Sequence, residues 1–338
     1  MHQPQVADER MVERQLPRAA SDYRPTVDIL RPVSPEHSQA FTEVAQSARI
    51  HWHMHHMCGD PQPGSNFAQV NDLYPVEKVS DRSRHYVDAA LEHLLMWADH
   101  VAPFKFHLEQ TISFTLRPTY TLARAALESA AQAVWLLSTS DPVECVRRHL
   151  SLIRRDLQEH RKSFQAAEDK ERCKQRETDL LEQVAEVFDE DKIRPPNGYL
   201  AVLQYACAPD DLDLDTGTVE RLWRSASGAA HGMYWPTLEL QHVVPGEEYE
   251  PGQFRAATIP DSGPMVEMIR AAYKMTQYAA LKHLLLSGAD PAALVGPAMR
   301  WLTDNVTKKE DVDPHLLQQL RADRPATWGR QDPGVGAD

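Results

Sequence analysis

Apolar and polar positions follow the period of an α-helix along most of the chain. Val87, Leu91 and Leu94 recur at helical intervals within residues 80–102, the spacing that gives a helix one apolar face. Residues 117–138 are alanine-rich and contain no glycine, so we expect a long buried helix there.

The next segments continue the helical pattern. Asp141 and Pro142 are typical of a helix start, and residues 168–192 read as a charged helix solvated on one side. The helix after Asp141 has an apolar seam with a 3.5-residue rhythm, which favours packing along an antiparallel neighbour. The seam consists of Val146, Leu150, Ile153, Leu157 and Phe164.

Both ends of this helical region also carry readable signals. Ser34 and Pro35 predict a helix start, while 237–244 and 254–260 look like a β-hairpin around the polar turn Pro-Gly-Glu-Glu. A last core helix is expected over residues 263–286, and a short helix near 291–302 should follow it. The core helix should place four residues on one face. These four are Ile269, Tyr273, Thr276 and Ala280.

The predicted fold class is therefore all-α, an up-and-down helical bundle with a small β-hairpin insertion. We expect a proline-rich disordered leader over 1–35 and a helical N-terminal addition over 36–78. The main bundle should span 79–305, with a loose C-terminal tail over 306–338.

The composition of the chain argues against several classes of function. The net charge is −13, which argues against a general nucleic-acid coat and leaves only local contacts to RNA. The four cysteines form no Cys-x-x-Cys pair, so neither a zinc ribbon nor a disulfide framework is expected. With no apolar signal segment and no long apolar run, we predict a cytoplasmic protein without a membrane partner.

The segment RLWRSASGAAHGMYW, residues 221–235, holds the main candidate site. Arg224 and His231 are seven residues apart, so a helix places them on one face, about 10 Å apart along its axis. Ser227 and Gly228 form a small floor between them, which leaves room for a ligand or for another helix. The opposite side should be a core stripe of Leu222, Ala226, Ala229 and Met233.

This pattern resembles the R-x(4–6)-H signature of HEPN domains, helical bundles found in many bacterial toxins and phage-defence proteins. The segment RAALESAAQAVWLL, with Arg124 and Glu128 one turn apart, is similar to the partner helix of one HEPN-like branch. The resemblance spans about residues 80–285.

The resemblance implies a metal-independent endoribonuclease that needs no cofactor and leaves a 2′,3′-cyclic phosphate. His231 would be the general acid and base, and Arg224 the phosphate clamp. From the residues alone, Arg224 could instead pair with Glu220 four residues earlier. Glu128 is the third catalytic candidate: it would orient the imidazole by contacting His231, or it pairs with Arg224 or with Arg124 one turn away. It also implies a homodimer, with an antitoxin or other protein partner as a further expectation. The alternative is a non-catalytic HEPN-like module that binds RNA or protein.

Two basic ridges follow the apolar seam of the helix after Asp141. Arg147, Arg154, Arg155 and Arg161 are the RNA-binding candidates, together with Ser227 near the Arg–His pair. Phosphate contacts from such ridges would give salt-dependent affinity. The alternative is a solvated face balanced by Asp156, Glu159 and the acidic helix that follows.

The segment HWHMHHMC, residues 51–58, is a weak metal candidate. His51 and His55 lie one helical turn apart and could chelate a transition metal. No carboxylate motif accompanies them, so the segment also reads as a half-buried helix end. We predict no resident metal.

Overall fold

The structure is a computed structural model that describes residues 33–104 and 115–306. These residues form eleven α-helices, two short 3-10 helices and one two-stranded sheet. The all-α prediction is therefore confirmed. The predicted leader and tail fall almost entirely outside the described residues.

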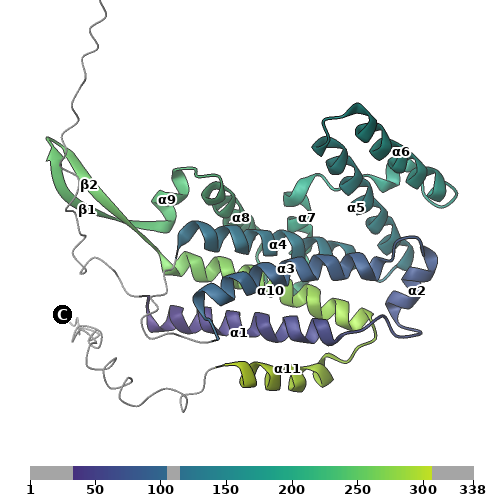
Figure 1. Ribbon diagram of the computed structural model, residues 1–338, viewed down its shortest axis with the longest axis horizontal. Helices are drawn as coiled ribbons and strands as arrows, with labels where there is room; N and C mark the ends of the chain where they lie inside the picture. The colour runs from purple at the N-terminus through teal and green to yellow at the C-terminus, as the bar shows by residue number, and fades with distance from the viewer. Residues whose placement is uncertain (1–32, 105–114, 307–338) are drawn as a thin grey trace, which may run out of the picture.

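Three long helices form the centre of the molecule: α3 (Val79–Val101), α4 (Leu116–Leu137) and α10 (Ser262–Leu286). As predicted, α4 is a long buried helix, and its alanines let the neighbouring backbones approach closely. Figure 1 shows α3, α4 and α10 lying side by side along the length of the molecule. They define the frame on which the candidate site is built.

The N-terminal helices share this core. In α1 (Pro35–Met57), the Phe41 ring meets that of Trp97 on α3 edge to face, with centroids 5.8 Å apart. The short α2 (Asn66–Leu73) contributes Phe67 and Val70 to the same cluster. The final helix α11 (Pro291–Asn305) packs on the outside of α1 (Figure 1).

Two predicted helix starts are confirmed by their caps. The Ser34 hydroxyl accepts a hydrogen bond from the His37 backbone N–H at 3.1 Å. The Asp141 carboxylate accepts one from Val143 at 2.9 Å, where α5 (Pro142–Ser163) begins. Each cap satisfies a backbone donor that the first helical turn leaves unpaired.

An arm of two helices rises from one end of the bundle (Figure 1). The arm consists of the outer part of α5 together with α6 (Ala167–Val184). The 3-10 helix η2 (Glu190–Ile193) follows α6 in the chain. The apolar seam predicted for α5 is buried from Val146 to Leu157, whereas Phe164 is the half-buried C-cap.

One helix escaped the sequence analysis. No element was assigned between the charged segment 168–192 and the Arg–His segment, but α7 (Gly198–Ala206) lies there. Its Val202, Leu203 and Ala206 are buried against α4. The 3-10 helix η3 (Asp210–Leu212) then leads to α8 (Thr216–Ala230).

The Arg–His helix is shorter than predicted. It ends at Ala230, with His231 as its C-cap and Gly232 at φ 70°, a conformation that glycine adopts without the Cβ strain of other residues. The predicted continuation to Trp235 is therefore wrong. Met233 is 54 % exposed, so it is not part of the core stripe that Leu222, Ala226 and Ala229 do form.

The β-hairpin is present, but its turn was misplaced. Residues 237–240 belong to the helix α9 (Trp235–Leu240), and Pro245 to Glu248 lie inside β1 (Gln241–Glu250). The turn is at Pro251 and Gly252, whose φ of 76° a tight hairpin requires. It leads into β2 (Gln253–Pro260), which pairs antiparallel with β1, for example His242 with Ile259.

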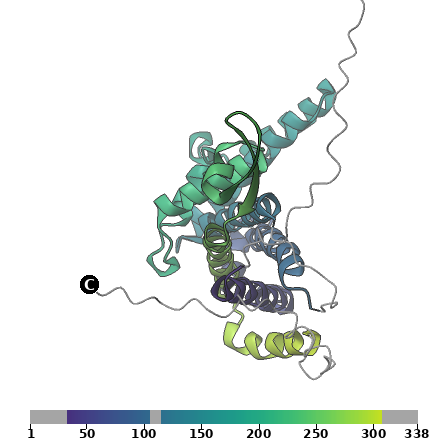
Figure 2. The ribbon, with the colours of Figure 1, turned by 90° about the vertical axis from the view of Figure 1, so that its left-hand side faces the viewer.

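Figures 1 and 2 both show this hairpin projecting away from the bundle. Among the described residues, none of the helices is long and apolar enough to cross a membrane.

Candidate functional site

The outer face of α8 presents Arg224 to solvent. The inner face is fixed to α4 by buried Leu222, Ala226 and Ala229. The Arg224 side chain is 56 % exposed, and its Nε and Nη2 donate to Glu220 Oε1 at 2.9 and 2.7 Å. This hydrogen bonding lowers the pKa of Glu220 below its ordinary value. An incoming anion would therefore compete with Glu220 for the guanidinium.

His231 closes the same helix. Its backbone N–H donates to the Ser227 carbonyl at 3.1 Å, while the residue itself is exposed. The imidazole makes no side-chain hydrogen bond with any of the described residues. Arg224, in the middle of α8, and His231, its C-cap, are therefore both exposed.

The small residues between them have different environments. Ser227 is half-buried, whereas Gly228 is buried beneath α9. A Cβ on Gly228 would lie 2.8 Å from Pro236 Cγ and 3.1 Å from the Trp235 ring. Gly228 therefore makes room for the neighbouring helix α9, which is the second of the two uses that the sequence left open, and it is not an open floor for a ligand.

Glu128 faces Trp223 rather than the imidazole. Its Oε1 accepts hydrogen bonds from Arg124 Nε at 2.8 Å and from the Trp223 indole N–H at 2.6 Å. The Arg124 guanidinium also lies 5.3 Å from the centroid of the Trp223 ring. These contacts tie α4 to α8, so Glu128 positions the helix that carries Arg224 and His231. No hydrogen bond joins Glu128 to His231.

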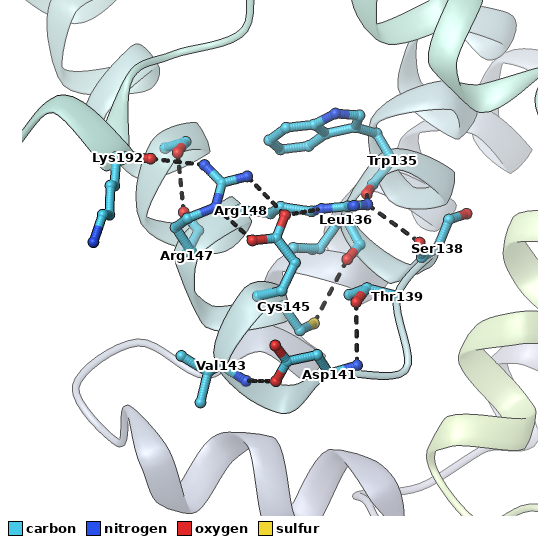
Figure 3. A network of polar contacts seen from close by, with 12 residues as sticks. Trp135, Leu136, Ser138, Thr139, Asp141, Val143, Cys145, Arg147, Arg148 and Lys192 are labelled. Carbon is cyan, nitrogen blue, oxygen red and sulfur yellow. Dashed lines mark hydrogen bonds and ion pairs between the residues drawn. The ribbon is translucent and has the colours of Figure 1, made fainter. Parts of the chain in front are cut away.

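The first basic ridge begins inside a network between α4 and α5. Figure 3 shows Arg147 beside the Lys192 carbonyl, which it reaches at 2.7 Å. Its guanidinium also donates to both oxygens of Glu144, at 2.6 and 2.7 Å. Hydrogen bonds from Arg147, with a further one from Arg148, hold the pKa of Glu144 at about 2.

Further along α5, Arg154 pairs with Glu177 at 2.9 Å and Glu190 at 2.6 Å. Arg161 reaches the same Glu177 at 3.5 Å. Although burial opposes it, hydrogen bonding from Arg154 lowers the pKa of Glu177. Carboxylates from α6 and η2 therefore already occupy much of this ridge.

Arg155 and the two acids named as counterions have other partners. Arg155 donates to Gln132 Oε1 and lies 5.0 Å from the centroid of the Tyr199 ring. Asp156 pairs with Arg82 of α3, and Glu159 pairs with Lys162 at 2.7 Å. The ridge is balanced chiefly by Glu144, Glu177 and Glu190.

His51 and His55 face different neighbours. His51 Nδ1 contacts the Ser47 carbonyl at 2.8 Å, and burial lowers the His51 pKa. His55 Nε2 lies 3.2 Å from Asp88, and its ring centroid is 4.8 Å from that of His283. Over residues 33–104 and 115–306, no three His, Cys, Asp or Glu side chains are grouped to hold a metal ion.

Large apolar side chains are exposed on α9 and the hairpin, the two elements that follow His231 in the chain, and they were not predicted as a feature of the site. They are Met233 and Tyr234 directly before α9, then Trp235, Leu238, Val243, Tyr249 and Phe254. The run of three large apolar residues after Gly232, Met233 to Trp235, was a readable signal for them.

Comparison of the chain with protein-family models, with curated proteins and with solved structures found no match in any of the three. Any functional conclusion therefore depends on the residues themselves.

Proposed function

We propose that the protein is a metal-independent endoribonuclease that acts at the outer end of α8. The supporting observation is that Arg224 of α8 and His231, the C-cap of the same helix, are both exposed to solvent. The resemblance of the RSASGAAH segment to HEPN domains points to the same chemistry. An RNA-cleaving toxin or phage-defence protein of the cytoplasm is the setting that this resemblance implies.

The chemistry needs a base, an acid and a phosphate clamp. His231 takes the proton of the RNA 2′-hydroxyl, whose oxygen then attacks the adjacent phosphorus. Arg224 binds the phosphate oxygens and stabilises the charge that develops on them. The 5′-oxygen leaves with a proton, and the other product keeps a 2′,3′-cyclic phosphate.

One imidazole cannot accept and donate a proton in the same step, so a homodimer completes the reaction. The His231 of a second copy supplies the leaving-group proton. Tyr234 and Trp235, both exposed next to His231, provide faces on which unpaired bases stack. Because the Arg224–Glu220 pair is solvent-exposed, a phosphate can replace the carboxylate at little cost.

Cleavage of a mixed RNA pool in EDTA tests this proposal. We expect the wild type to release fragments with cyclic-phosphate ends, and Arg224→Ala and His231→Ala to lose this activity. Arg221→Ala on the same helix and His85→Ala on α3 are matched controls, because both residues are also exposed. Equal fragmentation by all five proteins, or by none, would overturn the proposal.

The second candidate is a non-catalytic module that binds a protein partner or antitoxin. The number of large apolar side chains exposed on α9 and the hairpin favours it, since exposed apolar surface often marks a binding site. The hairpin also carries Glu247, Glu248 and Glu250, which repel RNA. Intact RNA, together with a partner whose binding is lost in Leu238→Ser, would favour this candidate.

A further inference from the structure

A thiol and an imidazole meet in the α5–α6 arm, far along the chain from α8. Cys173 Sγ of α6 lies 3.8 Å from His160 Nδ1 in the last turn of α5. Neither residue takes part in the proposed RNA cleavage. A thiol next to an imidazole is the arrangement that generates a reactive thiolate.

The pair opens on a cavity. Cys173 is 4 % exposed, and it lines a cavity of about 430 Å³ together with His160 and Phe164. A reagent therefore has to enter this cavity to meet the sulfur. The Phe164 ring, 4.6 Å from the imidazole by centroid, forms one apolar wall.

The same cavity is lined by two cations. Arg172 and Arg176 contribute guanidiniums, and Arg172 pairs with Asp169 at the rim. Arg176 makes no ion pair with any of the described residues. Its guanidinium is therefore available to an anionic ligand.

The other cysteines lack this environment. Burial raises the pKa of the Cys145 thiol to about 12 and that of Cys207 to about 11. Cys145 donates to the Leu136 carbonyl at 3.5 Å, and Cys58 to the Gly59 carbonyl at 3.7 Å. Cys173 is the one of the four whose sulfur contacts an imidazole.

We propose that Cys173 is a thiol-modification site for disulfides of acidic low-molecular-weight thiols, with His160 as the base and Arg176 as the anion contact. His160 Nδ1 takes the proton from Sγ, and the sulfur attacks one sulfur of the disulfide. The S–S bond breaks, and the departing thiolate receives the proton from His160. One disulfide and one thiol thus become a mixed disulfide and one free thiol.

The test compares two disulfide reagents on the folded full chain. 5,5′-Dithiobis(2-nitrobenzoate) carries two negative charges, and 4,4′-dithiodipyridine carries none at neutral pH. Peptide mapping by mass spectrometry identifies the cysteine that reacts first. We expect Cys173 to be labelled about tenfold faster than the other three cysteines. First labelling of another cysteine in the wild type would overturn the proposal, whatever the variants do.

Variants then test the base, His160, and the anion contact, Arg176, separately. His160→Phe keeps a ring against Phe164 but removes the base, so labelling by both reagents should slow about tenfold. Arg176→Gln should slow only the anionic reagent, and Cys207→Ser is the control that leaves both rates unchanged. If Cys173 of the His160→Phe variant is labelled at the wild-type rate and the melting temperature is unchanged, His160 is not the base. An Arg176→Gln variant with an unchanged ratio between the reagents would remove the anion contact.

Discussion

At the scale of single residues, Gly228 joins α8 to α9 because it lacks a side chain. Gly228→Ala would place a Cβ 2.8 Å from Pro236 Cγ, so either α9 shifts or the contact is strained. We expect a loss of about 1–3 kcal/mol in the free energy of unfolding, measured by urea denaturation. Gly59→Ala is the control, since nothing lies within 4 Å of a Cβ there. Equal stability of the two variants would contradict this.

Glu128 should act through stability and alignment rather than through proton transfer. Glu128→Gln keeps the size of the side chain but weakens the hydrogen bonds from Arg124 and Trp223. Since both partners become poorly paired, we expect unfolding to be easier by about 1–3 kcal/mol.

The same variant tests what Glu128 does in RNA cleavage. If it only positions α8, the pH profile of cleavage keeps its shape and only the rate falls. A shifted pH profile with unchanged stability would instead indicate direct contact with His231.

At the scale of elements, the arginines of α5 hold the α6 arm. Arg154→Ala removes pairs to Glu177 and Glu190, and leaves Glu177, whose side chain is 12 % exposed, without its main cation. We expect a loss of about 2–3 kcal/mol by urea denaturation. Lys162→Ala, which breaks an exposed pair, is the control and should change little. If Arg154→Ala is as stable as the wild type but loses RNA affinity, the arginine serves RNA instead.

Helix positions were predictable where local signals and burial agreed. The caps at Ser34 and Asp141 and the alanine-rich α4 follow directly from residue type and spacing. The end of α8 was not predicted, because residues 221–235 contain no proline and the helical spacing of apolar residues continues to Met233. In the structure, α8 ends just before Gly232 with its φ of 70°, and α9 packs over Gly228 directly after it.

The sequence predicted part of the candidate site, because helical spacing is a local property of the chain. Periodicity alone places Arg224 and His231 on one face of a helix. Helical spacing also places Glu220 within reach of Arg224 and Glu144 within reach of Arg147. It does not predict that Arg154 meets Glu177, which lies on another helix. The contact between Glu128 and Trp223, which are 95 residues apart, requires the bundle to be assembled.

At the scale of the whole molecule, buried neutral histidines should make the fold acid-sensitive. Burial lowers the pKa of His283 to about 3 and that of His149 to about 4, while unfolded histidine titrates near 6.5. Below pH 6.5 the unfolded chain therefore binds protons that the folded chain does not. Stability is complete above this pH and falls as the pH drops toward the folded values.

Urea denaturation at pH 7.5, 6 and 5 measures this effect. Each of the two histidines should contribute a loss of about 2 kcal/mol at pH 5. His149→Gln keeps a group that can donate to the Glu77 carbonyl but does not titrate, so the slope with pH should be shallower. Identical slopes in the two proteins would rule out His149 as a source of the effect.

In the proposed mechanism, His231 and Arg224 cleave RNA through the 2′-hydroxyl. The most direct measurement is cleavage of one defined single-stranded RNA in EDTA, beside the same oligonucleotide with 2′-deoxyribose at the cleaved position. We predict that the wild type cuts the RNA to a 2′,3′-cyclic phosphate, leaves the deoxy position intact, and loses this activity in His231→Ala. An intact RNA, or equal cutting of both oligonucleotides, would contradict the account.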